Sequence, residues 1–147
     1  MKFDFKTLPH HWVNRFAFLL RKELQERFRQ AGQDITAEEW AVLLLLWQQN
    51  GRGPAELADL TVRDRTTMTR LLDAMERKGL VGRKTDLKDR RRMLVTLTSK
   101  GRDLQAVLVP QAQALIGRTL KGIPEENIAT TLSTLRQMTE NLQKTGG

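Results

Sequence analysis

The chain has 147 residues, of which 39% are hydrophobic and 29% charged; this suits one folded domain and excludes a disordered or membrane-embedded protein. Its net charge of +8 implies an acidic partner, either nucleic acid, an anionic membrane or another protein. It contains no cysteine, which excludes disulfides, thiolate nucleophiles and thiol-based peroxide sensing.

Two long helices are predicted in the first third of the chain. Apolar residues recur at three- and four-residue steps over 8–29, with Pro9 in the first turn. Thr36 and Glu39 match a capping box before a second helix that ends near Gln49 and is apolar nearly all round, as in a protein core. Its apolar run is too short to span a bilayer and the N-terminus lacks a secretory signal, so we expect a cytoplasmic protein.

A helix-turn-helix is predicted next. A short helix spans 54–60, and after a turn a second one spans 65–78. Asp64 is placed to cap the second helix, and Gly79 ends it at a position that favours a left-handed residue.

The rest of the chain is predicted to be a hairpin and two long helices. Strands are expected over 80–84 and 93–97, followed by a helix from Thr98 to about Lys121 and a last helix after Pro124. The first helix and the last two carry more apolar surface than one small domain can cover. We expect them to form a homodimer; the alternative is that they pack on one another within a monomer.

Positive charge is concentrated on the second helix of the helix-turn-helix and on the hairpin. Residues 63–92 contain 11 Lys and Arg against 5 Asp and Glu, a net charge of +6. A helix that fits the major groove beside a basic hairpin that reaches an adjacent groove is typical of a winged helix-turn-helix. The predicted fold is therefore mostly α with a small β-hairpin, with a DNA-binding part over about 36–98 and dimerisation helices over about 8–30 and 98–143.

The recognition helix presents polar side chains opposite its apolar stripe. Arginine can bind guanine through two hydrogen bonds, and threonine can contact a phosphate or a thymine methyl group. The predicted DNA contacts are Arg65, Thr66, Thr67, Thr69 and Arg70. For Arg70 an ordinary surface ion network with Asp73 is the alternative.

The hairpin tip is the second predicted DNA contact. Asp89 can hold Arg91 in one pose, which suits insertion into a narrow minor groove; the alternative is a solvated turn whose charges aid solubility. One of the tip arginines could instead pack back on the hairpin stem. The predicted wing residues are Lys88, Asp89, Arg90, Arg91 and Arg92. Backbone-phosphate contacts are predicted at Arg52, Thr61 and Arg63.

Four segments in order resemble the multiple antibiotic resistance regulator (MarR) family. They are I-T-A-E-E-W-A-V-L (35–43), D-R-T-T-M-T-R-L-L-D-A-M-E-R-K-G-L-V (64–81), D-L-K-D-R-R-R-M-L-V-T-L-T-S-K-G (86–101) and the closing G-I-P-E-E-N with L-S-T-L-R-Q-M-T-E-N-L. The resemblance implies a single MarR-like domain over 1–147, and a homodimer on a palindromic operator that acts as a repressor. It also implies release by a small aromatic anion bound between the dimer layer and the winged domain.

An effector pocket near the first helix is predicted from that resemblance, at His11, Trp12, Phe16 and Trp40. The alternative is that the aromatic stripe is ordinary core and the histidine polar surface. No G-x-S-x-G, P-loop or H-E-x-x-H pattern is present, so we expect neither an enzyme nor a metal or other cofactor. The remaining alternative function is a winged-helix module for RNA or a protein partner, although the hairpin lacks aromatic residues for stacking on single-stranded RNA.

Overall fold

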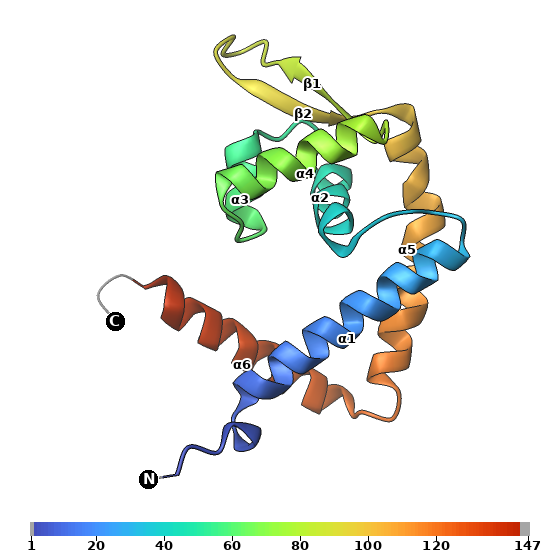
Figure 1. The fold of residues 1–147 in the computed structure, drawn as a ribbon. Coiled ribbons are helices and arrows are strands. Elements are labelled where there is room, and N and C mark those ends of the chain that lie inside the picture. Colours follow the sequence, from blue (N-terminus) through green and yellow to red (C-terminus); the bar gives the residue numbers. More distant parts are fainter. Residues whose placement is uncertain (1, 145–147) are drawn as a thin grey trace. The chain divides into compact units, whose positions relative to one another are not determined.

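The computed structural model describes residues 2–144 and has the predicted mostly helical fold with one hairpin (Figure 1). Within those residues the elements, in order, are η1 (Phe5–Thr7), α1 (Pro9–Gln30), α2 (Ala37–Gln48), α3 (Pro54–Leu60), α4 (Arg65–Arg77), β1 (Val81–Thr85), β2 (Met93–Leu97), α5 (Ser99–Leu120) and α6 (Glu125–Gln143). The chain divides into two compact units, Met1–Ala112 and Gln113–Gly147, with the boundary inside α5. No helix in residues 2–144 has both the length and the apolar character that crossing a membrane requires.

The helix ends in the first unit follow local chemistry. The capping box of α2 is present, since the Thr36 hydroxyl accepts the Glu39 amide and the Glu39 carboxylate accepts the Thr36 amide. Asp64 caps α4 as predicted, accepting the Thr67 amide at 2.7 Å. After α4, Gly79 adopts a φ of +74°, which glycine tolerates without steric cost.

One core holds the first unit together, and it lies between the helix-turn-helix, the hairpin and the inner faces of α1 and α5. Burying these side chains supplies most of the free energy that folds the unit. The fully or nearly fully buried apolar side chains include Phe28, Val42, Leu43, Leu46, Leu57, Met68, Leu72, Met75, Leu80, Val95 and Leu108.

The start of α5 approaches the hairpin so closely that only glycine fits at position 101. A Cβ on Gly101 would lie 2.2 Å from the Leu80 carbonyl oxygen, far inside contact distance. The Gly101 carbonyl also accepts the indole N–H of Trp47 at 2.9 Å. The base of the wing is thereby fixed against α5 and α2.

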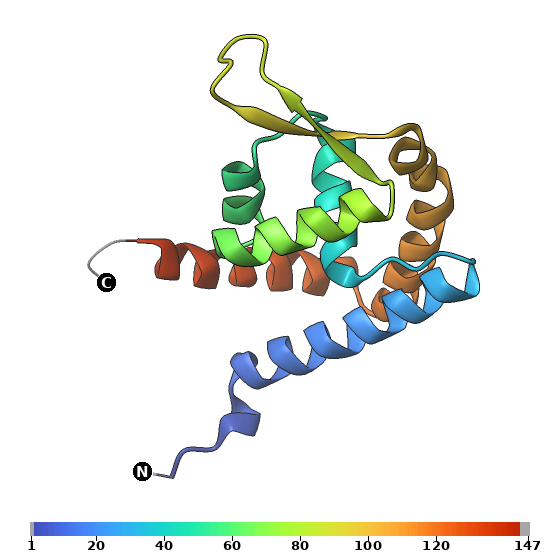
Figure 2. The same cartoon turned by 45° about the horizontal axis from the view of Figure 1, so that its top comes forward.

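The hairpin is a regular antiparallel pair that extends beyond the helices, with α4 beneath it (Figure 2). Val81 pairs with Leu97 at its base and Thr85 with Met93 near its tip. Arg52 forms an isolated bridge to Val95, with N···O distances of 3.2 and 2.8 Å. The chain before α3 therefore lies along the outer edge of β2.

The second unit comprises the last part of α5, a turn through Gly122 and α6. No residue of α6 is buried, although the helix carries an apolar stripe. Leu132, Leu135 and Leu142 are 50%, 38% and 90% exposed. Such a stripe is typical of a surface that packs against a partner.

Candidate nucleic-acid interface

The recognition helix α4 buries one face and exposes the predicted DNA-contacting face. Met68, Leu72 and Met75 are at most 1% exposed and anchor the helix in the core. The predicted contacts Arg65, Thr66, Thr67, Thr69 and Arg70 are all exposed along the first part of the helix. The structure thus brings these five residues together on one open surface.

Hydrogen bonds order the first turn of α4. The backbone amide and the hydroxyl of Thr67 hold the pKa of Asp64 below its ordinary value, with a further contribution from the Arg70 charge. The Thr69 hydroxyl donates to the Arg65 carbonyl at 2.8 Å, so its proton is engaged and its oxygen is left to act as an acceptor. Thr66 lies one turn earlier, where it can meet a phosphate near the helix N-terminus.

The wing tip is a braced turn rather than a loose basic loop. One oxygen of Asp89, Oδ1, accepts both the Arg91 backbone amide at 3.1 Å and the Arg91 Nε at 3.2 Å. Asp86 accepts the Lys88 amide at 2.9 Å, and the Asp86 amide donates to the Arg92 carbonyl at 2.9 Å. The predicted contact between Asp89 and Arg91 is present, and it leaves the Arg91 side chain 92% exposed.

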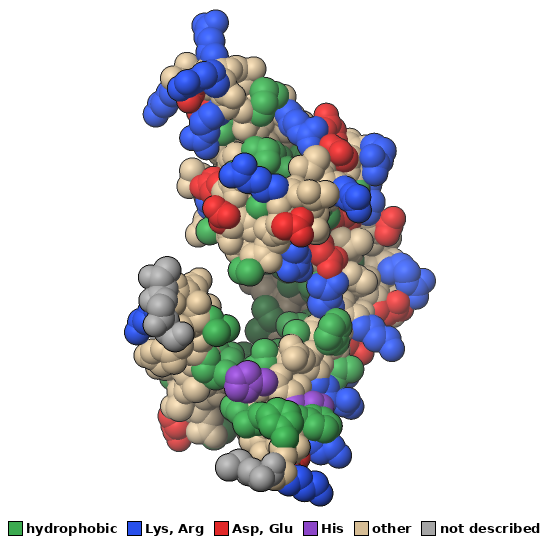
Figure 3. Space-filling model, turned by 60° about the vertical axis from the view of Figure 1, so that its left-hand side comes forward, with side chains coloured by type: hydrophobic (Ala, Val, Ile, Leu, Met, Phe, Trp, Pro, Cys, Tyr) green, Lys and Arg blue, Asp and Glu red, His purple; other side chains and the backbone are tan. Residues whose placement is uncertain are grey.

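Cationic side chains gather at the hairpin tip, at the top of Figure 3. Lys88, Arg90 and Arg91 are exposed there. Arg92 is exposed as well, but one of its guanidinium nitrogens, Nη2, lies 3.1 Å from the position that a Cβ on Gly53 would occupy. Arg92 is thus the tip arginine that packs back toward the helices.

Of the three predicted phosphate contacts, Arg52 is buried in the protein and not exposed to a DNA backbone. Its side chain is only 9% exposed, and the guanidinium donates to the Leu45 carbonyl, the Gln48 side chain and Glu56. All of these bonds are internal, so we do not retain Arg52 among the DNA contacts. Its guanidinium lies at the C-terminal end of α2, where a positive charge interacts favourably with the helix dipole.

The other two predicted phosphate contacts lie in the turn between α3 and α4. The Thr61 hydroxyl donates to the Leu57 carbonyl at 2.7 Å and is partly buried. Arg63 is exposed, with a long 3.5 Å contact to the Thr61 carbonyl. Between them Val62 has a φ of +55°, a left-handed conformation that is strained for a β-branched residue. Because the Arg63 side chain is exposed and its contact with the Thr61 carbonyl is long, its guanidinium stays available to a phosphate.

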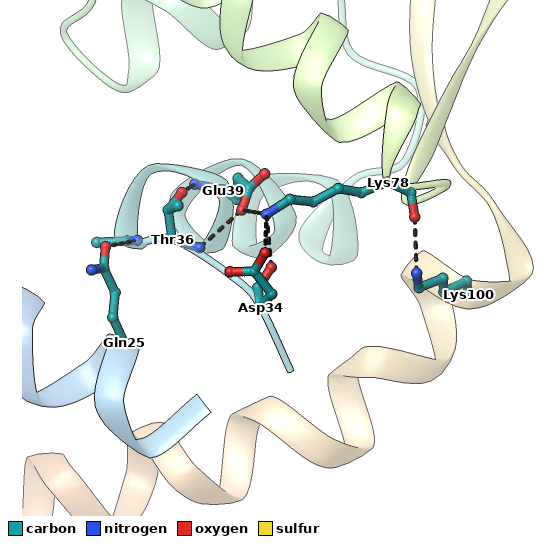
Figure 4. A network of polar contacts seen from close by, with 7 residues as sticks. Gln25, Asp34, Thr36, Glu39, Lys78 and Lys100 are labelled. Carbon is teal, nitrogen blue, oxygen red and sulfur yellow. Dashed lines mark hydrogen bonds and ion pairs between the residues drawn. The ribbon is translucent and has the colours of Figure 1, made fainter. Parts of the chain in front are cut away.

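A second network, which the sequence did not reveal, fixes the far end of the recognition helix (Figure 4). Lys78, the C-cap residue that follows α4, lies 2.8 Å from the carboxylate of Glu39 and donates to the Asp34 carbonyl at 2.7 Å. Glu39 is 2% exposed, so this carboxylate needs its cation. Lys100 of α5 donates to the Lys78 carbonyl at 2.9 Å, and Gln25 of α1 accepts the Ala37 amide at 2.8 Å.

The C-terminal end of α4 is therefore joined to α2, to the chain before α2 and to α5, while α1 contacts the same network at the start of α2. Glu39 was recognised from sequence only as half of a capping box, and its second function depends on Lys78, 39 residues away. Two further ion pairs were also missed: Arg83 of β1 contacts Asp73 and Glu76 of α4. For Asp73 the predicted ion network exists, but its partner is Arg83.

The four residues predicted for an effector pocket fall into two surroundings. Trp40 packs between Phe28 and Trp47, with ring centroids 5.2 and 5.6 Å apart, and is partly buried at the edge of the core. His11 contacts Trp12 edge-on at 5.2 Å near the N-terminal end of α1, and Phe16, one turn further on, is 52% exposed. The structure thus separates Trp40 from the aromatic cluster at the start of α1.

A groove of about 270 Å³ opens within the first unit between α2, α3 and the turn before α4. Its walls include Leu44 and Leu45 of α2, Leu60 of α3 and also Leu71 of α4, and Arg63 of the turn lines it as well. Glu38 also lines it; burial alone would raise the pKa of this carboxyl, but its own amide and Arg21 lower it overall. Among the residues described, no group of acidic or histidine side chains is arranged to hold a metal ion.

Comparison with known proteins gives transcriptional regulators as relatives. The chain is 33% identical to the transcriptional activatory protein BadR of Rhodopseudomonas palustris over 76% of its length, and it spans just under two thirds (66%) of BadR. It is 30% identical to the organic hydroperoxide resistance transcriptional regulator of Bacillus subtilis, over 79% of this chain and 80% of the relative.

Solved structures share the fold. BpsR of Bordetella bronchiseptica, described for regulation of its DNA binding by 6-hydroxynicotinic acid, superposes with a TM-score of 0.82 at 24% identity, over 95% of this chain and 98% of BpsR. CouR of Rhodococcus jostii, bound to p-coumaroyl-CoA, superposes with a TM-score of 0.81 at 24% identity, over 93% of this chain and 95% of CouR. The MarR family model matches residues 35–93, the segment that carries the helix-turn-helix and the wing. The chain belongs to the MarR family of DNA-binding transcriptional regulators and is not an enzyme.

Proposed function

We propose that the protein acts in the cytoplasm as a homodimeric repressor on a palindromic operator, with α4 in the major groove and the wing in the adjacent minor groove. The observation that carries the proposal is the position of Arg91, 92% exposed and held by Asp89 at the tip of a hairpin that is joined to α4 through Arg83. Arginine oriented in this way suits the negative potential of a narrow minor groove.

The exposed apolar faces support the dimer. In the first unit Trp12, Phe16 and Leu19 are 52–58% exposed along α1, and in the second unit α6 buries no residue. Two copies that cover these faces would present two recognition helices to successive major grooves, about 34 Å apart. A bound dimer would exclude other proteins from those grooves, which is the simplest route to repression. BadR is named as an activatory protein, so the sign of regulation needs its own measurement.

We further propose a small aromatic acid as effector, bound in the groove between α2, α3 and the turn before α4. The leucine walls suit an aromatic ring, and Arg63 can pair with a carboxylate. The solved structures of BpsR and CouR are described with 6-hydroxynicotinic acid and p-coumaroyl-CoA, an aromatic acid and an aromatic acyl thioester. The ligand carboxylate and a DNA phosphate would then compete for Arg63.

The proposal is tested by selecting bound duplexes from a random pool and sizing the complex by analytical ultracentrifugation. We expect an inverted repeat with half-sites about 10 base pairs apart and two protomers per duplex. Gel shifts with 6-hydroxynicotinic acid and p-coumaric acid, compared with benzyl alcohol as an uncharged control, should show release by the acids only. A single unrepeated site bound by a monomer would contradict the dimer, and retention of DNA at millimolar acid would contradict the effector. Reporter transcription from the selected duplex should fall when the protein is supplied; a rise would contradict repression.

A further inference from the structure

Arg83 joins the wing to the recognition helix through two ion pairs. From the middle of β1, its Nη2 lies 3.0 Å from Asp73 Oδ1 and its Nη1 lies 3.1 Å from Glu76 Oε2. Asp73 and Glu76 are three residues apart, so both carboxylates lie on one face of α4. A guanidinium can hold both at once because its N–H groups lie in a rigid fork, whereas a lysine offers one point charge.

These three residues, which we call the wing clamp, are too exposed to matter much for folding. The side chains of Arg83, Asp73 and Glu76 are 31%, 44% and 46% exposed, and ion pairs in that range add little to the free energy of unfolding. The core beneath them, with Met75 and Val95 fully buried, already holds the unit together. Stabilisation of the fold therefore does not account for these two ion pairs, and a different function has to be sought for them.

The clamp lies at the base of the wing, opposite a second attachment. Arg83 pairs in the hairpin register with Val95 of β2. The Val95 amide in turn donates to the Arg52 carbonyl at 2.8 Å, and the Arg52 side chain is fixed by internal hydrogen bonds. Each strand of the hairpin is thus attached to the helix-turn-helix at the same level, β1 to α4 and β2 to the chain before α3.

We propose that the wing clamp is a positioning device for DNA binding: it fixes the angle of the hairpin so that Arg91 enters the minor groove while α4 occupies the major groove. This inference rests on the proposed wing contact. Arg83 then acts through Arg91 rather than by touching DNA itself.

The length of the hairpin explains why a fixed angle matters. At about 3.3 Å per residue, the tip lies roughly 15–20 Å from Arg83. A rotation of about 10° at the base would move Arg91 by about 3 Å, which is half the width of a minor groove. A contact with bases or phosphates tolerates much less than that.

An electrostatic effect and a positioning effect of the clamp predict opposite changes in DNA affinity when its carboxylates are replaced. Asp73 and Glu76 repel DNA, so replacing them with Asn and Gln raises the local positive charge and, by electrostatics alone, should tighten binding to any duplex. If the clamp positions the wing, the same change should weaken binding to the cognate duplex only. The double variant Asp73→Asn/Glu76→Gln is therefore the decisive one.

The test measures affinity for a duplex selected by the wild-type protein and for a scrambled duplex of equal composition. We expect the double variant and Arg83→Gln to lose about 10-fold in affinity for the selected duplex, and Arg83→Lys to lose part of that although it keeps the charge. For the scrambled duplex the double variant should bind as well as or better than the wild type. Asp59→Asn, an exposed carboxylate of α3 outside the clamp, is the matched control and should not lose affinity. Tighter binding of the double variant to both duplexes would overturn the inference.

A double-mutant cycle with Arg91→Ala separates this inference from the function on which it rests. If the clamp acts through the wing, Arg91→Ala should strongly lower the affinity of the wild type for the selected duplex and lower that of the double variant only a little. No effect of Arg91→Ala in the wild type would refute the wing contact itself. An equal effect in both backgrounds would refute the clamp alone. Circular dichroism and urea unfolding identify folded variants; should Arg83→Gln not fold, the double variant and Arg83→Lys carry the test.

Discussion

Asp89 holds Arg91 with a single carboxylate oxygen, which accepts the Arg91 backbone amide at 3.1 Å and its Nε at 3.2 Å. The bond to Nε orients the guanidinium while its two terminal nitrogens remain open to solvent, with the side chain 92% exposed. The acidic residue at the tip of a basic hairpin thus prepares the cation for a partner, since the conformational entropy of the side chain is already reduced.

Replacing Asp89 should therefore weaken DNA binding even though it removes a negative charge. Arg91→Ala is expected to cost about 1–3 kcal/mol in operator affinity, because it removes the cation, and Asp89→Ala a part of that amount. Fluorescence anisotropy on the selected duplex measures both. Lys88→Ala is the control for charge at the same tip and should weaken cognate and scrambled duplexes alike. Tighter binding by Asp89→Ala would show that its charge outweighs its orienting effect.

Arg65 and Thr66 should determine sequence preference. Arg65→Ala is expected to cost about 1–3 kcal/mol on the selected duplex and to relax the preference for one base pair, if the guanidinium reads guanine. Repeating the duplex selection with the variant shows which position has become degenerate. An unchanged set of selected sequences with uniformly lower affinity would assign Arg65 to the phosphate backbone instead.

The buried carboxylate of Glu39 makes Lys78 important for stability. Lys78→Met should lower the free energy of unfolding by about 1–3 kcal/mol, because it leaves a 2% exposed carboxylate with only its capping hydrogen bond. Urea unfolding at pH 7 measures the change. Lys100→Met removes a lysine that bonds only a carbonyl in the same network, and it should cost clearly less. Equal losses of unfolding free energy for the two variants would contradict the claim that the buried Glu39 carboxylate depends on the Lys78 charge.

Stability at low pH should depend on Asp64. Its pKa is lowered in the folded protein from an ordinary value of 3.8, so its stabilising contribution is complete above that value and is lost as the pH falls through the folded pKa. Asp64→Asn keeps a cap that accepts the Thr67 amide but cannot titrate. Unfolding curves from pH 6 to pH 2.5 should show the wild type losing stability more steeply below about pH 4 than the variant. Parallel curves would argue against the cap as the cause.

Gly101 should tolerate no side chain. Gly101→Ala places a Cβ 2.2 Å from the Leu80 carbonyl oxygen, so α5 or the base of β1 must shift. We expect a loss of about 1–3 kcal/mol in the free energy of unfolding, as for other overpacked sites, while Gly82→Ala, where an added Cβ meets nothing within 4 Å, provides the comparison. An unfolding midpoint of Gly101→Ala equal to that of the wild type would contradict the close approach of Gly101 to the Leu80 carbonyl.

The sequence predicted the helices and strands well because their ends carry local signals. Pro54, Asp64, Gly79 and Thr98 each mark a boundary by restricting a dihedral angle or by accepting a backbone amide, and the structure places boundaries at or next to all four. The turn Phe5–Thr7 was missed because three residues carry no periodicity. The exposed face of α4 followed from the apolar stripe opposite it.

The long-range contacts could not be predicted in the same way. Arg52 seemed a surface cation from sequence, but the bridge to Val95, 43 residues later, draws it against the end of α2. Lys78 and Glu39 are likewise joined only by the tertiary fold. For Arg83 a weak signal existed, since Asp73 and Glu76 place two carboxylates on one side of a basic helix. Nothing local indicated that a strand residue would hold both.

The most direct test of simultaneous major- and minor-groove binding is a paired chemical footprint on the selected duplex. Methylation protection reports guanine N7 in the major groove, and hydroxyl-radical cleavage reports the minor-groove edge of the backbone. We predict two major-groove protections one helical turn apart, each flanked by a minor-groove protection that Arg91→Ala alone abolishes. A wild-type footprint without flanking minor-groove protection would contradict the account.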